Sequence, residues 1–194
     1  MSKTQVENHE FIYSMPVFLV GANVNEKPNF MTAGLGGIVC DKPPLIYISL
    51  LPSRYTLKGI RQNWSFSVNL PSSDLAKEVD YCGMKSGSKV DKVKVCKFEV
   101  FYGKLSNAPM IKKCPANVEC KVVNIMDLGS QTMIIGRIES SYISDNYLTD
   151  RQPDMDKINP LIFTPWPDHH YQFLGGFAGK AFSMGTELKN KEEK

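Results

Sequence analysis

Hydroxyl and cationic side chains gather in one short stretch of this 194-residue chain, between Pro52 and Trp64. Ser53 precedes an apolar repeat with spacings of three and four, so we expect it to cap the N-terminus of a helix. The start of a helix carries roughly half a positive charge and several free N–H donors. With Arg54, Thr56 and Lys58 nearby, this helix start has the chemistry of a phosphate site. The same pattern also fits an ordinary surface helix with a solvated charged face.

The rest of that helix carries two stripes. Leu57, Ile60 and Trp64 recur every three or four residues, which predicts one apolar face against the core. Lys58 and Arg61 fall on another face, turned away from the helix start. These two cations therefore fit a solvated face better than a phosphate contact.

A second stretch, from Asn29 to Gly37, mixes glycines with apolar residues. It is too glycine-rich for a core strand and too apolar for a solvated loop. Glycine lets a backbone come close to a ligand or to a neighbouring strand, so a ligand contact and a kinked barrel strand both remain open. Its spacing is not Gly-x-Gly-x-x-Gly between a strand and a helix, so no dinucleotide-binding loop is predicted.

A third stretch is polar and basic. Cys82 to Lys89 reads as a glycine-containing loop, and the following segment, Val90 to Lys97, is rich in lysine and includes Lys92. This pattern fits either another anion site or a solvated basic turn.

The remaining chain reads as strands. Leu45 to Leu51 is a continuous apolar run, which predicts a strand buried on both faces. Ser65 to Leu70 alternates, which predicts Ser65, Ser67 and Asn69 on the outer face. Further strands are expected over 13–24, 117–125, 131–143 and 160–163, with 117–143 forming a long hairpin. About seven strands with one or two short helices and no regular alternation predict a mainly β fold, a barrel with appended helices.

Composition narrows the class of protein. A net charge of +3 is too small to indicate nucleic-acid binding, and no apolar run approaches the ~18 residues of a membrane span. The polar N-terminus lacks the apolar segment of a signal peptide, which favours the cytoplasm. We expect an arm over 1–12, one domain over 13–186 and a charged tail over 187–194.

The five cysteines form no Cys-x-x-Cys pair, and only three histidines accompany them. This predicts reduced, partly buried thiols and no metal site. No arrangement of Ser, His and Asp or of paired carboxylates predicts a catalytic acid or base.

These stretches together resemble the FMN-binding split-barrel family of flavin reductase-like proteins, and within it the flavoredoxin branch. The resemblance covers roughly Met15 to Gly185. It rests on the order of Asn29-Phe-Met-Thr-Ala-Gly34, Ser53-Arg-Tyr-Thr56 with Ile60, Phe66-Ser-Val-Asn69, Cys82-Gly83, Ser86-Gly87, Asp91-Lys92, and Tyr171 before Leu174-Gly175.

The resemblance implies a Greek-key split barrel that works as a homodimer, with FMN at or near the subunit interface. It implies that the backbone of Met31, Thr32 and Ala33 lies along the isoalloxazine at its N5 and O4 edge. Ser53, Arg54 and Thr56 would hold the phosphate, with Lys92 as a further contact from either subunit. Tyr171 would stack near the flavin or pack as a core aromatic. The positions expected to contact FMN are Asn29, Met31, Thr32, Ala33, Gly34, Leu50, Ser53, Arg54, Tyr55, Thr56, Ser86, Lys92 and Tyr171.

The same resemblance implies an oxidoreductase whose chemistry belongs to the flavin. An electron carrier, or a reductase that oxidises NADH or NADPH and serves a redox partner protein, is the leading interpretation. The alternatives are a reductase that releases reduced flavin to an oxygenase, and a protein that binds FMN without turnover. Cys82 shows no resolving partner in the sequence, so we expect it to be structural.

Overall fold

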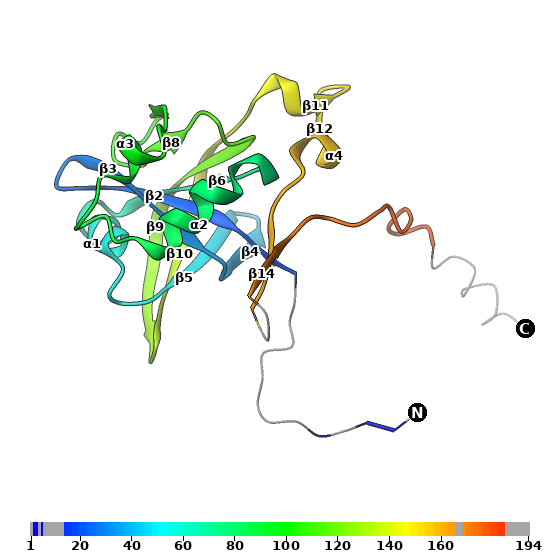
Figure 1. Cartoon of the computed structure of the whole chain (residues 1–194), viewed down its shortest axis with the longest axis horizontal. Helices are drawn as coiled ribbons and strands as arrows, with labels where there is room; N and C mark the ends of the chain where they lie inside the picture. The colour runs from blue at the N-terminus through cyan, green and yellow to red at the C-terminus, as the bar shows by residue number, and fades with distance from the viewer. Residues whose placement is uncertain (1, 4, 6–13, 166–168, 185–194) are drawn as a thin grey trace, which may run out of the picture.

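The largest unit of the fold is an antiparallel sheet of seven strands, in the order β3-β2-β6-β9-β10-β5-β4. It is seen in a computed structural model that describes residues 2–3, 5, 14–165 and 169–184. β3 and β4 are the two edges of the sheet and do not pair with each other, so the sheet does not close (Figure 1). The predicted mainly β fold with short helices is confirmed. The predicted tail over 187–194, most of the arm over 1–12 and the start of the first strand at Tyr13 lie outside the described residues.

The elements follow one another in a simple order. The sheet consists of β2 Phe18–Val24, β3 Lys27–Ala33, β4 Gly36–Asp41, β5 Pro44–Leu50, β6 Ser65–Leu70, β9 Ala116–Leu128 and β10 Gln131–Ile143. The short strands are β1 Met15–Pro16, β7 Val100–Phe101, β8 Met110–Ile111, β11 Leu148–Thr149, β12 Gln152–Pro153, β13 Ile162–Thr164 and β14 His170–Gln172. The helices are α1 Tyr55–Asn63, α2 Ala76–Met84, α3 Lys92–Val95 and α4 Met155–Ile158, with 3-10 turns at Ser73–Leu75 and Asp145–Tyr147.

The prediction that Ser65, Ser67 and Asn69 face solvent on β6 is wrong, because all three are buried. Ser67 and Asn69 are fully buried, since the chain around β8 covers this face of the strand. Ser67 donates a hydrogen bond to the Pro109 carbonyl. The Asn69 amide donates to the Leu19 carbonyl at 2.7 Å and accepts from the Ile111 N–H at 2.9 Å. A buried polar side chain is stable only when such partners are present.

The long hairpin of β9 and β10 is confirmed. Glu119 on β9 is completely buried, and it accepts hydrogen bonds from the backbone N–H groups of Lys104 and Leu105 at 2.8 and 2.7 Å. The Tyr142 hydroxyl adds a third bond at 2.9 Å. Burial alone opposes ionisation of Glu119, but these donors hold its pKa below the usual range.

The strand expected over Leu45 to Leu51 is present as β5, although it is not buried on both faces. Ile46, Ile48 and Leu50 are buried, whereas Tyr47 and Ser49 between them are half-buried. The second face of β5 is therefore only partly covered.

Helix α1 packs against β2 through Leu57 and Ile60, as its apolar stripe predicts. Trp64 is not part of that stripe: it ends the helix in a left-handed conformation and is 54% exposed. Arg61 pairs with Asp127 at 2.9 Å on the surface.

Helices α2 and α3 lie beside the edge strand β3, over a second hydrophobic core. Val79 and Cys82 of α2 are buried in it. Helix α2 continues to Met84, so the predicted loop starting at Cys82 begins three residues later. Strand β3 thus has β2 on one side and the ends of two helices on the other.

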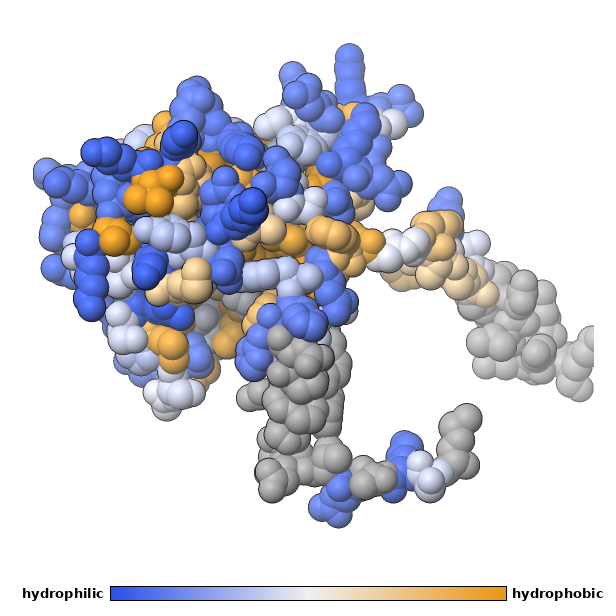
Figure 2. All heavy atoms as spheres, in the orientation of Figure 1, coloured by the Kyte–Doolittle hydropathy of each residue, from blue (hydrophilic) through white to orange (hydrophobic). Residues whose placement is uncertain are grey.

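The last described residues, 173–184, lead away from the body of the molecule (Figure 1). Apolar side chains are exposed along this segment, among them Phe177 at 88% (Figure 2). Among the described residues, no helix is both long enough and apolar enough to span a membrane.

Candidate functional site

Two neighbouring hollows lie along β3, one small and one large. The small hollow has a volume of about 170 Å³. Its lining consists of Met31, Ser53, Arg54, Tyr55, Thr56, Met84, Lys85, Ser86, Gly87 and Lys92. Seven of these ten are among the positions that the sequence predicts for FMN, so the fold gathers residues that are up to about sixty positions apart. Sites for whole small molecules are usually about 300–1,000 Å³, so this hollow suits one polar end of a ligand.

The start of α1 forms one wall of the small hollow. The helix begins at Tyr55 with Arg54 as its N-cap, so the prediction of Ser53 as the cap is wrong: Ser53 lies one residue before it. No side chain in the described part of the chain caps this helix end, which leaves backbone N–H groups for another acceptor. The buried Thr56 hydroxyl accepts a hydrogen bond from Asn29 at 2.7 Å, which fixes the helix start to β3.

Two cations meet at the opposite wall, where α2 ends. Arg54 donates to the Gly83 carbonyl at 3.1 Å, and Lys92 donates to the Cys82 carbonyl at 2.8 Å. The last carbonyls of a helix have no partner within the helix, and its C-terminus attracts positive charge. Lys92 also donates to the Phe30 carbonyl of β3 at 2.8 Å. The helix end thus positions both cations.

Neither cation is paired with a carboxylate among the described residues. Lys92 is only 4% exposed, and burial lowers its pKa, with the charge of Arg54 adding to the effect. An ammonium has three donors and a guanidinium has five. Lys92 uses two of its donors and Arg54 uses one of its own, so both side chains retain donors for an anion.

Gly87 allows the following loop to close over the hollow. A Cβ there would lie 1.8 Å from the Asn29 side-chain oxygen and 3.1 Å from the Tyr55 ring. Any larger residue would therefore displace the loop. The neighbouring Ser86 hydroxyl lies 2.9 Å from that of Ser88. The resemblance included both Ser86 and Gly87, but only Ser86 was predicted to contact FMN, and the role of Gly87 appears only from its contacts.

The free edge of β3 continues from the small hollow through Thr32, Ala33 and Gly34. In an antiparallel pair the N–H and C=O groups of alternate residues point away from the partner strand. Because the Phe30 carbonyl points outward to Lys92, the backbone groups of Thr32 also point outward. The Thr32 hydroxyl is occupied by the Val79 carbonyl. The predicted glycine-kinked segment is therefore a regular edge strand up to Ala33, and it presents backbone donors and acceptors.

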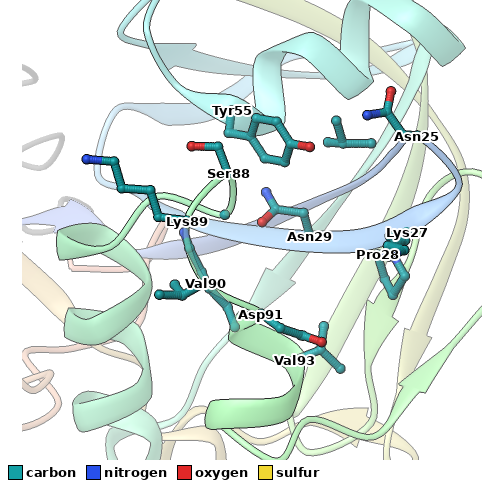
Figure 3. Close-up of a pocket in the computed structure, with 13 residues that line it drawn as sticks. Asn25, Lys27, Pro28, Asn29, Tyr55, Ser88, Lys89, Val90, Asp91 and Val93 are labelled. Carbon is teal, nitrogen blue, oxygen red and sulfur yellow. The ribbon is translucent and has the colours of Figure 1, made fainter.

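The large hollow has a volume of about 520 Å³ and lies beyond Asn29, toward the turn between β2 and β3. Its lining shares Tyr55, Gly87 and Lys92 with the small hollow. Figure 3 shows Asn29 on β3 with Tyr55 on one side of it and Asp91 on the other.

Five predicted residues are not in the lining of either hollow: Thr32, Ala33 and Gly34, which follow Met31 along the chain, together with Leu50 and Tyr171. Leu50 is buried in the main core. Tyr171 packs against Phe163, with ring centres 5.8 Å apart, and its hydroxyl donates to Asp80 at 3.4 Å. Burial and the charge of Asp80 raise the pKa of Tyr171 to about 12.

Two of the free cysteines interact with each other, which the sequence did not predict. The buried Cys82 thiol is hydrogen-bonded to Cys96, which follows α3. Burial raises the pKa of both thiols, that of Cys82 to about 12, so both are protonated at neutral pH. No group of histidine, cysteine and carboxylate side chains in the described part of the chain could hold a metal ion.

Known proteins are similar to this chain in both sequence and fold. The family model described as "Flavin reductase like domain" matches residues 11–165. The crystal structure of a flavoredoxin from Methanosarcina acetivorans is 44% identical, with a TM-score of 0.92 over 97% of this chain and 100% of that one. A flavoredoxin of Desulfovibrio vulgaris is 32% identical, with a TM-score of 0.88 over 95% and 100%.

A protein of Archaeoglobus fulgidus that is described only as uncharacterized is 33% identical over 147 residues, which are 76% of this chain and 82% of that protein. The family model covers most of the chain, including β3, α1, α2 and α3. The chain therefore belongs to the family of flavin reductase-like domain proteins, and two flavoredoxins are among the solved structures that are similar to it.

Proposed function

We propose that this protein binds FMN in the small hollow and along β3, and that it transfers electrons through the bound flavin. The flavin supplies two-electron chemistry when bound, so the chain needs no catalytic acid or base. What the chain supplies is a phosphate site and an edge strand for the ring system.

The observation that carries this proposal is the pair of cations, Arg54 and Lys92, without a carboxylate partner at the end of α2. A buried ammonium that contacts only carbonyls, beside a second cation, is costly unless a negative charge completes the site. Together with Ser53, Thr56 and the free start of α1, they match the charge and donors of a phosphate dianion.

The ring system of the flavin would lie on β3 beyond the phosphate. The outward backbone groups of Thr32 are suited to the N5 and O4 edge of an isoalloxazine. Met31 and Ala33 bury their side chains in the main core, and Gly34 has no side chain; a Cβ there would lie 3.4 Å from the Phe163 ring. Leu50 and Tyr171 would then contribute through the cores on which β3 and β13 rest, since neither lines the hollow.

Binding of FMN is tested by titration of the purified chain, with visible absorbance and flavin fluorescence as readouts. We expect a yellow protein, or saturable binding of added FMN at one site per chain. Arg54→Ala should weaken binding by about 10- to 150-fold, because a charge-assisted hydrogen bond is worth about 1.5–3 kcal/mol. The surface variant Arg61→Ala, which removes a cation from the same helix, is the matched control. A colourless chain that binds no added FMN contradicts the proposal.

NADH or NADPH is the proposed electron donor, and a redox protein the proposed acceptor. Anaerobic mixing of the FMN-loaded chain with either nucleotide should bleach the flavin absorbance. A carrier should keep its FMN through gel filtration, whereas loss of the flavin after reduction would instead indicate a reductase that supplies free reduced flavin to an oxygenase.

We further propose a homodimer in the cytoplasm. All five cysteines are free, which suits a reducing compartment. The apolar segment 173–184, which leads away from its own body, suits a second copy of the chain. Sedimentation velocity should show a dimer, and Phe177→Asp should shift it toward monomer without unfolding it. A monomeric wild-type chain contradicts this part of the proposal.

A further inference from the structure

A contact between two thiols lies beside the small hollow. Cys82 is in the last turn of α2 and is completely buried, whereas Cys96 ends α3 as its C-cap and is partly exposed. Both side chains pack in the second hydrophobic core, where they share a hydrogen bond. Both thiols are free, so the pair is a dithiol with one sulfur that solvent can reach.

The pair joins the two ends of the segment that closes the small hollow. The Cys82 carbonyl accepts the Lys92 ammonium at 2.8 Å, and the Cys96 N–H donates to the Lys92 carbonyl at 2.9 Å. The chain between the two cysteines supplies half of the lining of that hollow, namely Met84, Lys85, Ser86, Gly87 and Lys92. A covalent bond between the two sulfur atoms would therefore fix both ends of this lining segment.

The other three cysteines do not offer the same combination. Cys114 lies in the same core as Cys82 but is completely buried, so a bond between these two would involve no exposed sulfur. Cys120 is buried in the main core. Cys40 is partly exposed, but it lies on the edge strand β4. Only Cys82 and Cys96 thus combine a neighbouring thiol with access for an oxidant.

We propose that Cys82 and Cys96 are a site of reversible disulfide formation, and that the disulfide slows the release of FMN from the small hollow. This inference rests on the proposed function, because it concerns the retention of the same flavin. The loop that includes Gly87 lies against Asn29 and Tyr55, and it has to move away from them before FMN leaves. A disulfide between the ends of that loop restricts this movement.

Hydrogen peroxide is the oxidant in this step. The Cys96 sulfur attacks the peroxide, the O–O bond breaks, and a sulfenic acid and one water form. The Cys82 sulfur then attacks the sulfenic sulfur, the S–O bond breaks, and the proton of Cys82 leaves with the hydroxide as a second water. The two thiols lose two electrons, and the peroxide gains them. A dithiol reductant restores both cysteines by exchange.

The surroundings of the pair determine how fast it reacts. Burial raises the pKa of both thiols, and the nearby Lys92 ammonium partly offsets this effect. Since the thiolate is the nucleophile, the reaction at neutral pH is slow. The dithiol is therefore the resting form, and the disulfide accumulates only when peroxide persists.

The test treats the full FMN-loaded chain with hydrogen peroxide and maps the products by mass spectrometry after alkylation of the remaining thiols. We expect one peptide pair joined through Cys82 and Cys96, and a fall by two in the five cysteines that react. FMN release on dilution, measured by flavin fluorescence, should be about 5- to 100-fold slower, and dithiothreitol should restore the original rate. Closure of a loop of about 15 residues should also lower the unfolding equilibrium constant in urea by about 30- to 150-fold, measured without flavin.

Two variants separate this disulfide from other oxidation. Cys96→Ser should bind FMN as the wild type does, but peroxide should change neither its FMN release nor its stability in urea. Cys40→Ser is the matched control, because it removes another partly exposed thiol, and it should keep both effects of peroxide. Because Cys96 is partly exposed, its serine variant avoids the buried polar group that Cys82→Ser would create.

The outcomes are distinguishable. A chain that binds FMN but gives only a sulfinic acid at Cys96, or a bond from Cys82 to Cys114, overturns the inference and leaves the proposed function intact. A disulfide between Cys82 and Cys96 that leaves FMN release unchanged also overturns it. Failure of both the dithiol and the disulfide forms to bind FMN overturns the proposed function itself, whereas the peptide map and the urea measurement, which need no flavin, still report on the disulfide.

Discussion

Replacement of Lys92 by methionine tests directly whether its buried charge serves the ligand or only the fold. Methionine has a similar length, so Lys92→Met removes the ammonium and its hydrogen bonds with little change in packing. In the wild type the ammonium donates to the carbonyls of Phe30 and Cys82, both at 2.8 Å. The variant leaves both carbonyls without this donor.

The expected effect on stability has two opposing parts. An unsatisfied buried carbonyl costs about 1–3 kcal/mol. The variant also relieves the burial of a charge, the effect that lowers the pKa of Lys92. We therefore expect a net loss of about 1–3 kcal/mol in the free energy of unfolding, measured by urea denaturation without flavin. Lys89→Met, at an exposed position of the same loop, should change it by less than about 0.5 kcal/mol.

The effect on FMN binding is separate and of similar size. Loss of one charge-assisted bond to the phosphate predicts an affinity lower by about 10- to 150-fold, measured by fluorescence titration of folded variant. The pH dependence gives a second readout. Burial lowers the pKa of free Lys92 and an anion raises it, so wild-type affinity should fall as pH rises through that lowered pKa. The variant should lack this decline.

A folded Lys92→Met protein that binds FMN as tightly as the wild type, with the same pH profile, would refute this reasoning. Lys92 would then serve only to cap α2 and the free edge of β3. A loss of affinity without any loss of stability would instead mean that the two carbonyls find other donors, and would leave the phosphate contact in place.

Three more predictions follow from single positions. Gly87→Ala should weaken FMN binding at least tenfold and lower the free energy of unfolding by about 1–3 kcal/mol, because the new Cβ collides with Asn29; unchanged flavin affinity would show that the loop does not close on the ligand. Glu119→Gln should destabilise the fold by about 1.5–3 kcal/mol at pH 7. Because the folded pKa of Glu119 is lowered, the difference from the wild type should shrink as pH falls through that pKa in urea denaturation, and a constant difference would contradict the assignment. Asn69→Leu should lower the thermal unfolding midpoint by several degrees, since it strips partners from buried backbone groups on two strands; an unchanged midpoint in calorimetry would count against this network.

The local sequence pattern was enough to predict several strands of the sheet. Alternation and turn residues predicted the β9–β10 hairpin and β6, because a strand repeats every two residues wherever it lies in the fold. A continuous apolar run predicted β5. The order of short motifs also carried the family resemblance. Ser53, Arg54, Tyr55 and Thr56 are neighbours in sequence, so their place at the start of one helix needs no distant contact.

Only the tertiary structure decided which side chains are buried by segments that are distant in the sequence. The sequence of β6 alone places Ser67 and Asn69 outward, but the chain around β8 covers them and satisfies their hydrogen bonds. Trp64 fits an apolar stripe, yet the helix ends there and leaves it exposed.

The environment of Lys92 in the candidate site likewise could not be predicted from the local sequence. In sequence it belongs to a basic turn, but the end of α2 and the free edge of β3 present carbonyls that bury it beside Arg54. Helix ends and sheet edges leave backbone groups without partners, and which side chain reaches them depends on packing between segments that are far apart in the chain. The sequence alone thus predicted which residues carry the chemistry, and only the fold decided which of them lie together.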